Sequence, residues 1–583
     1  MLNTIEVWDN YYKDTVMRSG LIAWYGFKAS DTVLEIYPEN GALTLYLKDC
    51  CKQIYVLLRE RTQYWDQLEK ENKNVTCIDI EKLQLYENQF DYELVINAFP
   101  FWNDLASITE QLKVWKKYLK TSGTLLMAVN NLLSINKAIG IKNVYGKKEF
   151  GKNEITELLS NIYENVRIYN VFPDYIFPQV ICADDYRCNQ NVVERLIPYA
   201  RNIYEIIQDE IPMYYSAAQN NILAQIAGSF LAECSDVDRP SKEDFITITS
   251  ERGERGLITS LRREGEVIKK ALPGYKKNQI EKIASNLNNL HDKGINVVPY
   301  YIRDDKLVMP YIKEHTLAEL MSVLIEKKTD EFISLLDQLI QTVEKSSEPS
   351  KGIDEYWEQK YGRHDWGKIL QRGYIEMTPL NCFYVEKEIV FFDQEYIMNN
   401  CPLNYIIYRC LAHLYSLNSK YEKCIPIEYF KDKYKLKDSW EIYEQAERDF
   451  LHSIRTDKHT RNFEKYLCLY NRWQYDLLGN VQVDRDIRRL LRNIEDKEIA
   501  VIGVGKYYDL FMQQFGSLLQ VDILVSNEPK QIGKIVNGKK IYSLDYLKNK
   551  NVVVFVCVKE YEKICKELNE ISCDYRIYSP EVW

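Results

Sequence analysis

Short runs of apolar and β-branched residues alternate with longer amphipathic stretches between about residue 30 and residue 130. This alternation predicts a parallel β-sheet covered by helices on both faces, because each parallel strand needs a crossover before the next. The stretch 105–119 has the hydrophobic period of one such helix. The strands that we expect are residues 32–36, 54–57, 75–78, 93–97 and 124–129.

The chain length of 583 residues is too great for one hydrophobic core, so we expect several domains. An apolar fraction of 46% and a charged fraction of 28% are typical of folded globular proteins. The net charge of -9 argues against a general nucleic-acid binder, which would carry a basic surface. We therefore predict an α/β multi-domain protein with no nucleic-acid partner.

No apolar run approaches the roughly 18 residues that a membrane-spanning helix requires. The first residues lack both the basic and the apolar segment of a signal peptide. The 14 cysteines include no Cys-x-x-Cys pair, and the six histidines form no metal-ligand motif, so we expect reduced thiols and no structural zinc. These features predict a cytoplasmic protein, with docking at the membrane through a partner left open.

Beyond the first alternating region the pattern changes several times. Residues 225–310 are typical of short strands around one helix at about 276–293, and a largely helical region with a strand at 388–392 follows. A charged helix at 484–492 precedes a small α/β unit with strands at 498–502, 521–525 and 552–556. The predicted domains are 1–198, a linker helix at 199–222, 223–480 and 481–583.

The first domain resembles the class I S-adenosylmethionine-dependent methyltransferases. Residues 33–36 (Val-Leu-Glu-Ile) and 41–44 (Gly-Ala-Leu-Thr) are similar to the family's first strand, glycine loop and first helix. Residues 90–96 and 119–126 are similar to its fourth and fifth strands. The resemblance implies a methyltransferase-like Rossmann sheet with S-adenosylmethionine near Glu35 and Gly41.

The cofactor loop departs from the family pattern. Tyr37 and Glu39 stand at two glycine positions, where side chains would project toward the cofactor. Leu58 stands where the family has an acidic ribose ligand, with Glu60 as a displaced candidate. We therefore predict a methyltransferase fold that no longer binds its cofactor, and a working methyltransferase with an unusual loop is the alternative.

A later segment narrows the resemblance. Residues 172–178 (Phe-Pro-Asp-Tyr-Ile-Phe-Pro), followed by Asp184-Asp185-Tyr186, are similar to a segment of methyltransferase-like proteins of bacterial cell-surface polysaccharide synthesis. A kinase-like domain often follows in those proteins. The resemblance implies a glycan or sugar-nucleotide substrate, and glycosyltransferases of a polysaccharide assembly complex as partners.

The second domain resembles the kinase-like half of polysaccharide chain-terminating methyltransferase–kinase proteins, which are related to aminoglycoside phosphotransferases. Residues 376–381 (Glu-Met-Thr-Pro-Leu-Asn) and 393–395 (Asp-Gln-Glu) are similar to the catalytic and metal-binding loops. The resemblance implies a protein-kinase-like α+β domain that uses Mg-ATP. Glu376 would accept the proton of a hydroxyl, and Asn381 and Asp393 would hold Mg²⁺.

The same resemblance implies residues for the nucleotide. Lys269 would neutralise the phosphates, with Lys270 as the fallback, and Glu281 on the next helix would orient the lysine by an ion pair. Residues 307–312, with Met309, are similar to the strand and hinge that hold adenine.

Two features of the second domain depart from the kinase pattern. The family base is Asp rather than Glu376, and a carboxylate displaced by about one ångström can lower a rate on the order of 100-fold. Residues 252–256 are the nearest stretch to a glycine-rich loop, and a plain turn is the better interpretation of them. The pattern fits a slow kinase or an ATP-binding pseudokinase.

The third domain begins with a buried strand that runs into Gly503 and Gly505, as in dinucleotide-binding folds. Tyr508 replaces the third glycine of the motif, and Ser526 stands where an NAD site has an acidic residue. Residues 537–544 and 552–558 resemble a small Rossmann-like module of sugar-modifying proteins. We expect a nucleotide, a sugar nucleotide or a docking partner here, and not NAD.

Together these resemblances imply a transferase-like protein of cell-surface polysaccharide assembly whose kinase-like domain phosphorylates a glycan hydroxyl. One alternative is a non-catalytic scaffold of pseudoenzyme domains. The other is an active methyltransferase.

Overall fold

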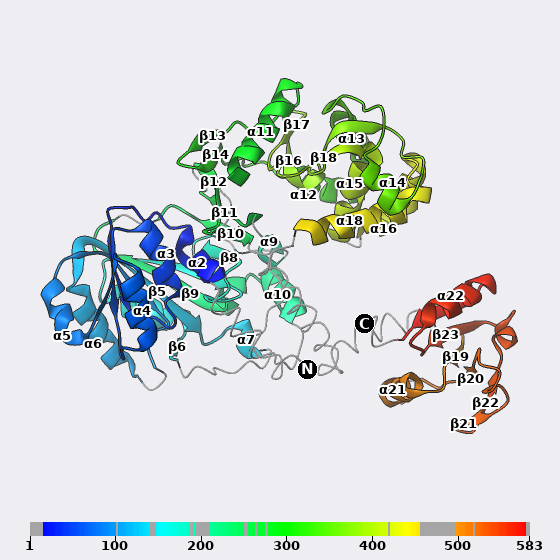
Figure 1. The fold of residues 1–583 in the computed structure, drawn as a ribbon, viewed down its shortest axis with the longest axis horizontal. Coiled ribbons are helices and arrows are strands. Elements are labelled where there is room, and N and C mark those ends of the chain that lie inside the picture. The colour runs from blue at the N-terminus through cyan, green and yellow to red at the C-terminus, as the bar shows by residue number, and fades with distance from the viewer. Residues whose placement is uncertain are drawn as a thin grey trace. The chain divides into compact units, whose positions relative to one another are not determined.

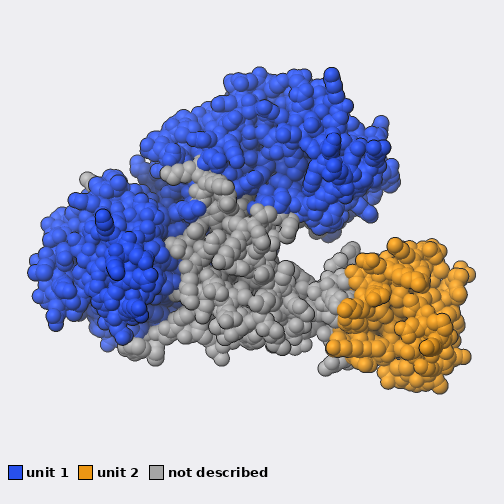
Figure 2. All heavy atoms as spheres, viewed as in Figure 1, with its two compact units in different colours: residues 1–138, 142–199, 211–466 blue, residues 139–141, 200–210, 467–583 orange. Residues whose placement is uncertain are grey.

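The computed structural model describes residues 15–100, 103–138, 147–186, 188, 190–193, 210–238, 241–249, 255–262, 265–274, 278–417, 420–454, 494, 497–516 and 519–578. The chain divides into two compact units (Figure 2). The first comprises residues 1–138, 142–199 and 211–466, and the second comprises residues 139–141, 200–210 and 467–583. Among the described residues, no helix has the length and apolar character needed to cross a membrane.

The first unit begins with five parallel strands in the order β3-β2-β1-β4-β5. They belong to the blue part of the ribbon in Figure 1. They confirm the five strands predicted from the alternating pattern. The order reverses direction between β1 and β4, and open α/β sheets place ligands at the carboxyl ends of the strands beside such a reversal. The strands are β1 (Thr32–Ile36), β2 (Gln53–Leu57), β3 (Val75–Ile78), β4 (Phe90–Ile96) and β5 (Leu119–Asn131).

Amphipathic helices connect these strands, and their apolar sides complete the core. Leu47 and Leu68 from the helices are buried in one cluster with Val33, Ile54 and Leu94 from the strands. Burial of this apolar surface is the main force that holds the layers together. The helices are α2 (Thr15–Ala23), α3 (Ala42–Cys50), α4 (Gln63–Glu71), α5 (Ile80–Leu83), α6 (Leu105–Lys116), α7 (Ile135–Ala138) and α8 (Lys152–Ser160).

The sheet extends beyond β5 through strands from a later part of the chain. β9 (Ser229–Ser235) lies between β5 and β7 (Asn165–Phe172) and is antiparallel to both. β8 (Val180–Ala183) pairs with the other edge of β7. The sheet therefore continues past residue 198, where the sequence pattern had placed the end of the first domain. Strand pairing across 100 residues leaves no local signal that could have shown this.

The same sheet then continues into the next part of the unit. β10 (Phe245–Thr249) pairs with β8, and Phe245 stands opposite Cys182. The order from there is β10-β11-β12-β14-β13, which makes a sheet of fourteen strands when β6 (Glu149–Phe150) on β5 is included. The added strands are β11 (Leu257–Leu261), β12 (Glu266–Ala271), β13 (Tyr301–Arg303) and β14 (Lys306–Pro310).

Helices and two short hairpin-like sheets form the rest of the first unit. The predicted helix near 276–293 is confirmed as α11 (Asn278–Asp292), and the predicted strand near 388–392 is confirmed as β17 (Glu388–Phe391). β17 pairs with β16 (Cys382–Val385), and β15 (Ile369–Tyr374) pairs with β18 (Ile397–Pro402). The remaining helices are α9 (Gln190–Val193), α10 (Glu210–Gln219), α12 (Leu317–Lys327), α13 (Thr329–Lys345), α14 (Glu355–Tyr361), α15 (Leu403–Leu417), α16 (Lys420–Cys424), α17 (Ile427–Lys433) and α18 (Trp440–Ile454).

The second unit contains a six-stranded sheet in the order β21-β22-β20-β19-β23-β24. Its three predicted strands are confirmed as β19 (Glu498–Ile502), β20 (Ile523–Val525) and β23 (Val552–Val556). The predicted charged helix at 484–492 lies outside the described residues. The other elements are α21 (Lys506–Phe515), β21 (Ile535–Val536), β22 (Lys539–Tyr542), α22 (Tyr561–Glu570) and β24 (Asp574–Ile577).

Candidate functional site

The loop after β1 makes the tight turn that the sequence pattern predicted. Gly41 has a φ of 71°, and a Cβ at this position would lie 2.9 Å from the hydroxyl of Tyr64 and 3.1 Å from Trp65. Glycine is therefore required by both the backbone angle and the close approach. Tyr37, at the start of the loop, also has a positive φ of 50°.

Glu35 lies at the end of β1 and is buried. Its carboxylate accepts a hydrogen bond from the Thr44 hydroxyl on α3. Burial raises the pKa of Glu35 to about 7, although the Thr44 hydrogen bond and the charge of Arg18 act in the opposite direction. This carboxyl group therefore titrates near neutral pH.

Glu39 is held by three other side chains. Arg18, on α2, forms an ion pair at 3.2 Å between Nη2 and Glu39 Oε2. The hydroxyl of Tyr175 donates to Glu39 Oε1 at 3.0 Å, and Nδ2 of Asn97 donates to the same oxygen at 3.3 Å and to the Tyr175 hydroxyl oxygen at 2.8 Å. We call Arg18, Glu35, Glu39, Asn97 and Tyr175 the first-sheet cluster.

The first-sheet cluster includes residues that the sequence motifs did not identify as site residues. Tyr175 belongs to the quoted segment 172–178, so this segment contacts the loop after β1. Asn97 directly follows β4 and has a positive φ of 50°, and only its place at the end of the predicted strand 93–97 could have indicated it. Arg18 precedes all the motifs described above, and no sequence pattern near it indicated a site residue.

The segment after β2, where class I methyltransferases have a carboxylate, contains the positively charged side chain of Arg59. The Arg59 guanidinium carbon lies 4.2 Å from the centre of the Tyr37 ring, and Nη2 donates to the carbonyl oxygen of Ala98 at 2.9 Å. Glu60, the displaced candidate for ribose binding, is exposed. S-adenosylmethionine is a sulfonium cation whose ribose hydroxyls need an acceptor here. Because Arg59 and Tyr37 pack together and Glu39 is already bound within the chain, these residues do not fit that cofactor.

A second cluster forms around Lys269 on β12. Its ammonium group pairs with the carboxylate of Asp393, and Nζ lies 3.6 Å from Glu395 Oε1. The side chains of Lys269 and Glu395 are 7% and 1% exposed, whereas that of Asp393 is 25% exposed. Lys269 and Asp393 are 124 positions apart in the sequence. The structure thus brings together two residues that the kinase resemblance had assigned to one nucleotide site, although it had paired Lys269 with Glu281.

The segment 376–381 packs directly against residues 393–396. Glu376 Oε2 accepts hydrogen bonds from the backbone amides of Glu395 at 2.5 Å and Tyr396 at 3.0 Å. The carbonyl oxygen of Glu376 accepts from Asn381 Nδ2 at 3.2 Å and from Gln394 Nε2 at 3.1 Å. We call Lys269, Glu376, Asn381, Asp393 and Glu395 the lysine cluster.

Asn381 and Asp393 are brought close by the backbone. The amide of Phe392, which precedes Asp393, donates to the carbonyl oxygen of Asn381 at 3.0 Å. No group of three His, Cys, Asp or Glu side chains suited to a metal ion occurs in the part of the chain that the structure describes. Mg²⁺ commonly needs only one or two protein oxygens when substrate phosphates and water complete its shell. The amide oxygen of Asn381 and the carboxylate of Asp393 are a donor set of that type.

The other residues that the resemblance assigned to the nucleotide are Glu281, Lys270 and Met309. Glu281 is exposed on α11, and it is Asp393 and Glu395 that lie within ion-pair distance of Lys269. Lys270 is the next residue of β12, and burial lowers the pKa of its ammonium group to about 8. Met309 is buried on β14 opposite Val267, as a residue at the edge of an adenine site would be.

The glycine turn of the second unit is present. Gly503 has a φ of 100°, and a Cβ there would lie 2.5 Å from the carbonyl oxygen of Cys557. Gly505 caps α21, and a Cβ on it would meet nothing within 4 Å. Tyr508, in place of the third glycine, is buried and accepts a hydrogen bond from Asn537 at 3.3 Å. The Tyr508 side chain belongs to the buried face of α21, together with Phe511 and Phe515.

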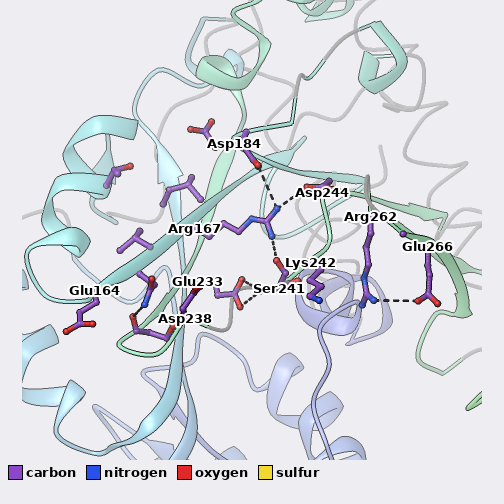
Figure 3. A pocket seen from close by; sticks show the side chains of 17 residues that line it. Glu164, Arg167, Asp184, Glu233, Asp238, Ser241, Lys242, Asp244, Arg262 and Glu266 are labelled. Atoms are coloured by element: carbon purple, nitrogen blue, oxygen red, sulfur yellow. Dashed lines mark hydrogen bonds and ion pairs between the residues drawn. The ribbon is translucent and has the colours of Figure 1, made fainter. Parts of the chain in front are cut away.

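A charged pocket of about 1690 Å³ lies where β7 begins and β9 ends (Figure 3). Arg167 at its centre pairs with Asp244 at 3.1 Å and with Asp185 at 3.7 Å. The backbone amide of Ser241 donates to Glu233 at 3.0 Å. The sequence motifs did not indicate this pocket, which is assembled from strand ends far apart in the chain. Its ionisable lining residues are Glu164, Arg167, Asp184, Asp185, Glu233, Asp238, Lys242, Asp244, Arg262 and Glu266.

No protein-family model and no curated protein matches this chain. Several solved methyltransferases are similar to part of it. Mitomycin 7-O-methyltransferase matches at 16% identity over 26% of this chain and 49% of its own length, with a TM-score of 0.23. A methyltransferase from Archaeoglobus fulgidus that depends on S-adenosylmethionine matches at 15% identity over 37% of this chain and 91% of its own length, with a TM-score of 0.25.

A third solved structure is the 1,6-didemethyltoxoflavin-N1-methyltransferase of Burkholderia thailandensis, with 16% identity over 25% of this chain and 67% of its own length, and a TM-score of 0.20. This chain thus covers about half the length of the mitomycin enzyme. With identities of 15–16% and TM-scores of 0.20 to 0.25, these likenesses establish neither a shared fold nor a shared function. The parallel strand order β3-β2-β1-β4-β5 by itself is that of a Rossmann-like sheet.

Proposed function

We propose that residues 245–454 form a Mg-ATP-binding, phosphotransferase-like module, and that the chain acts in the assembly of a cell-surface glycan. The observation that supports this proposal is the convergence of Lys269, Asn381 and Asp393. The sequence resemblance assigns these three residues to phosphate and metal, and they come from three separate segments of the chain. The acceptor would be a glycan hydroxyl, as the resemblance implies.

The charge balance of the lysine cluster favours a divalent cation. One ammonium group, on Lys269, faces two carboxylates, on Asp393 and Glu395. The local charge is therefore negative on the side of Asp393, the more exposed of the two carboxylates. Bound Mg²⁺ would neutralise this charge and the phosphates together. Arg255 lies 4.9 Å from the ring centre of Tyr396 and places a further cation beside the same segment.

A second function is favoured by the position of Glu376. Its carboxylate accepts two backbone amides from residues 395 and 396, so it holds that segment in place. A carboxylate engaged in this way is a weaker candidate for taking a proton from an acceptor. This observation favours an ATP-binding scaffold of glycan assembly, whose partners would be glycosyltransferases and whose ligands would be glycans or sugar nucleotides.

The experiment is a calorimetric titration of the full chain with Mg-ATP. We expect saturable binding that is lost in Asp393→Ala and retained in Asp330→Ala, which removes an exposed carboxylate from the first turn of α13. Absence of binding to the unaltered chain would overturn the proposal. Glu376→Gln then separates the two functions: loss of ATP turnover with unchanged binding indicates a kinase, and no turnover in either protein indicates a scaffold.

A further inference from the structure

We propose that Glu395, and not Glu281, is the carboxylate that positions Lys269 for the nucleotide phosphates. This inference rests on the proposed Mg-ATP function of the lysine cluster. It assigns to Glu395 a positioning role that neither the sequence motifs nor the likeness to methyltransferases indicates.

The first observation is the contact itself. Glu395 Oε1 lies 3.6 Å from Lys269 Nζ, and both side chains are almost completely buried. A buried ammonium group needs a carboxylate nearby, because removal of a charge from water is costly when it is not paired. Glu281, by contrast, is exposed on α11. The partner of Lys269 that is shielded from solvent is therefore Glu395.

The second observation is how α11 contacts the cluster. Asn286 of α11 is buried, and its Nδ2 donates to the carbonyl oxygen of Gln394 at 2.8 Å. The helix thus binds the backbone next to Glu395 and does not reach Lys269 through Glu281. Its buried face also carries the apolar residues Ile280, Ile283, Leu287 and Leu290.

The third observation is that Glu395 is itself held in place. Its amide donates to Glu376 at 2.5 Å, and the side chain of Gln394 donates to the carbonyl oxygen of Glu376 at 3.1 Å. Because these two hydrogen bonds hold the backbone around Glu395, its side chain loses little further conformational freedom when it orients Lys269. Glu376 therefore acts on Lys269 indirectly, through Glu395.

The two carboxylates around Lys269 would have separate tasks when the nucleotide binds. Asp393 is partly exposed and close to Asn381, so these two residues would hold Mg²⁺, which would neutralise phosphate charge there. Glu395 is buried and would remain as the anion that keeps the ammonium group in position. Without Glu395, the lysine would have no fixed anionic partner once the metal is bound.

The test compares two charge-neutralising variants of the full chain, Glu395→Gln and Glu281→Gln. Calorimetry measures the Kd of Mg-ATP and, separately, of adenosine, which has no phosphates. We expect Glu395→Gln to weaken Mg-ATP binding about tenfold or more while adenosine binding stays unchanged. We expect Glu281→Gln to change neither.

A double-mutant cycle separates positioning from a purely structural role. If Glu395 acts through Lys269, adding Glu395→Gln to Lys269→Met should cause no further loss of Mg-ATP affinity. If Glu395→Gln does not fold, Glu395→Asp keeps the charge on a shorter side chain and should weaken Mg-ATP but not adenosine. Equal losses for both ligands, or a loss in Glu281→Gln alone, would overturn the inference. An unaltered chain that binds adenosine but not Mg-ATP would instead overturn the proposed function, and the inference with it.

Discussion

Arg18 and Glu39 form an ion pair at 3.2 Å across the loop that follows β1, and their side chains are only 4% and 10% exposed. The pair joins α2 to the place where a methyltransferase-like sheet would hold its cofactor. It also receives the hydroxyl of Tyr175 from the segment 172–178. Glu39 is therefore bound by side chains of the chain itself.

The first prediction concerns the stability that this pair provides. Glu39→Ala leaves the buried guanidinium of Arg18 without its closest anion, which should lower the free energy of unfolding by about 3 kcal/mol. Urea denaturation followed by tryptophan fluorescence measures the change. Glu110→Ala removes an exposed pair with Lys113 and should leave the midpoint nearly unchanged. Equal, small shifts in both variants would show that the pair contributes little.

The second prediction concerns S-adenosylmethionine. Titration of the unaltered chain should give no binding heat, because Arg59 packs on Tyr37 and Glu39 is already bound by Arg18. The same titration with Glu35→Ala is the control. Saturable binding to the unaltered chain that weakens in Glu35→Ala would contradict the prediction and restore the methyltransferase alternative.

The third prediction concerns a buried carboxyl group in β4. Glu93 is completely buried, and neither carboxyl oxygen has a hydrogen-bond partner among the described residues. Burial raises the pKa of Glu93 well above its ordinary value. The folded chain therefore keeps a proton that the unfolded chain releases above about pH 4.3. The contribution of Glu93 to stability is therefore highest below that pH and falls as the pH rises toward the folded-state pKa of this carboxyl group.

Replacement of Glu93 by an apolar residue of similar size should remove the free-energy cost of burying its ionised carboxylate. We expect Glu93→Met to raise the free energy of unfolding more at pH 8 than at pH 5, because the cost of burying the ionised carboxylate grows as the pH rises above the pKa of the unfolded chain. Urea midpoints at the two pH values measure the difference. Glu110→Gln, on the exposed side of α6, should give the same shift at both. A gain for Glu93→Met that does not depend on pH would contradict the prediction.

The fourth prediction concerns Gly228, directly before β9. A Cβ on this residue would lie 1.6 Å from the carbonyl oxygen of Pro173, a contact that the backbone cannot accept without moving. We expect Gly228→Ala to destabilise the first unit on the order of 3 kcal/mol. Thermal unfolding measures the loss. Gly26→Ala places its Cβ in open space and serves as the control, and equal melting temperatures of the two variants would contradict the prediction.

The sequence indicated the local structure well where hydrophobic periodicity was strong. The five strands of the first sheet and the helix α11 were predicted within a few residues, because strands buried on both faces appear as short apolar runs and a helix buried on one face shows its period in the sequence. The positions of β9 and β10 in the same sheet were not predicted. Their partners are β5, β7 and β8, and pairing of strands separated in the chain depends on the whole fold.

The candidate sites show the same division. Motif order alone associated Lys269 with Asp393, and the structure places them in contact. The choice between Glu281 and Glu395 could not come from spacing, because it depends on which face of α11 is buried and on the Asn286 contact with the backbone of Gln394. Likewise, the glycine losses at Tyr37 and Glu39 were visible in the sequence, but Arg18 as the partner of Glu39 was not.

For this protein the sequence by itself determined the five parallel strands, the helix near 276–293 and the three strands of the second unit, and it suggested residues for phosphate and metal chemistry. Only the tertiary structure decided which carboxylates face Lys269, and which side chains bind Glu39 in the loop after β1. The physical reason is that periodicity and motifs report interactions between residues near one another in the chain. Ion pairs in a buried cluster depend on packing between segments that are far apart.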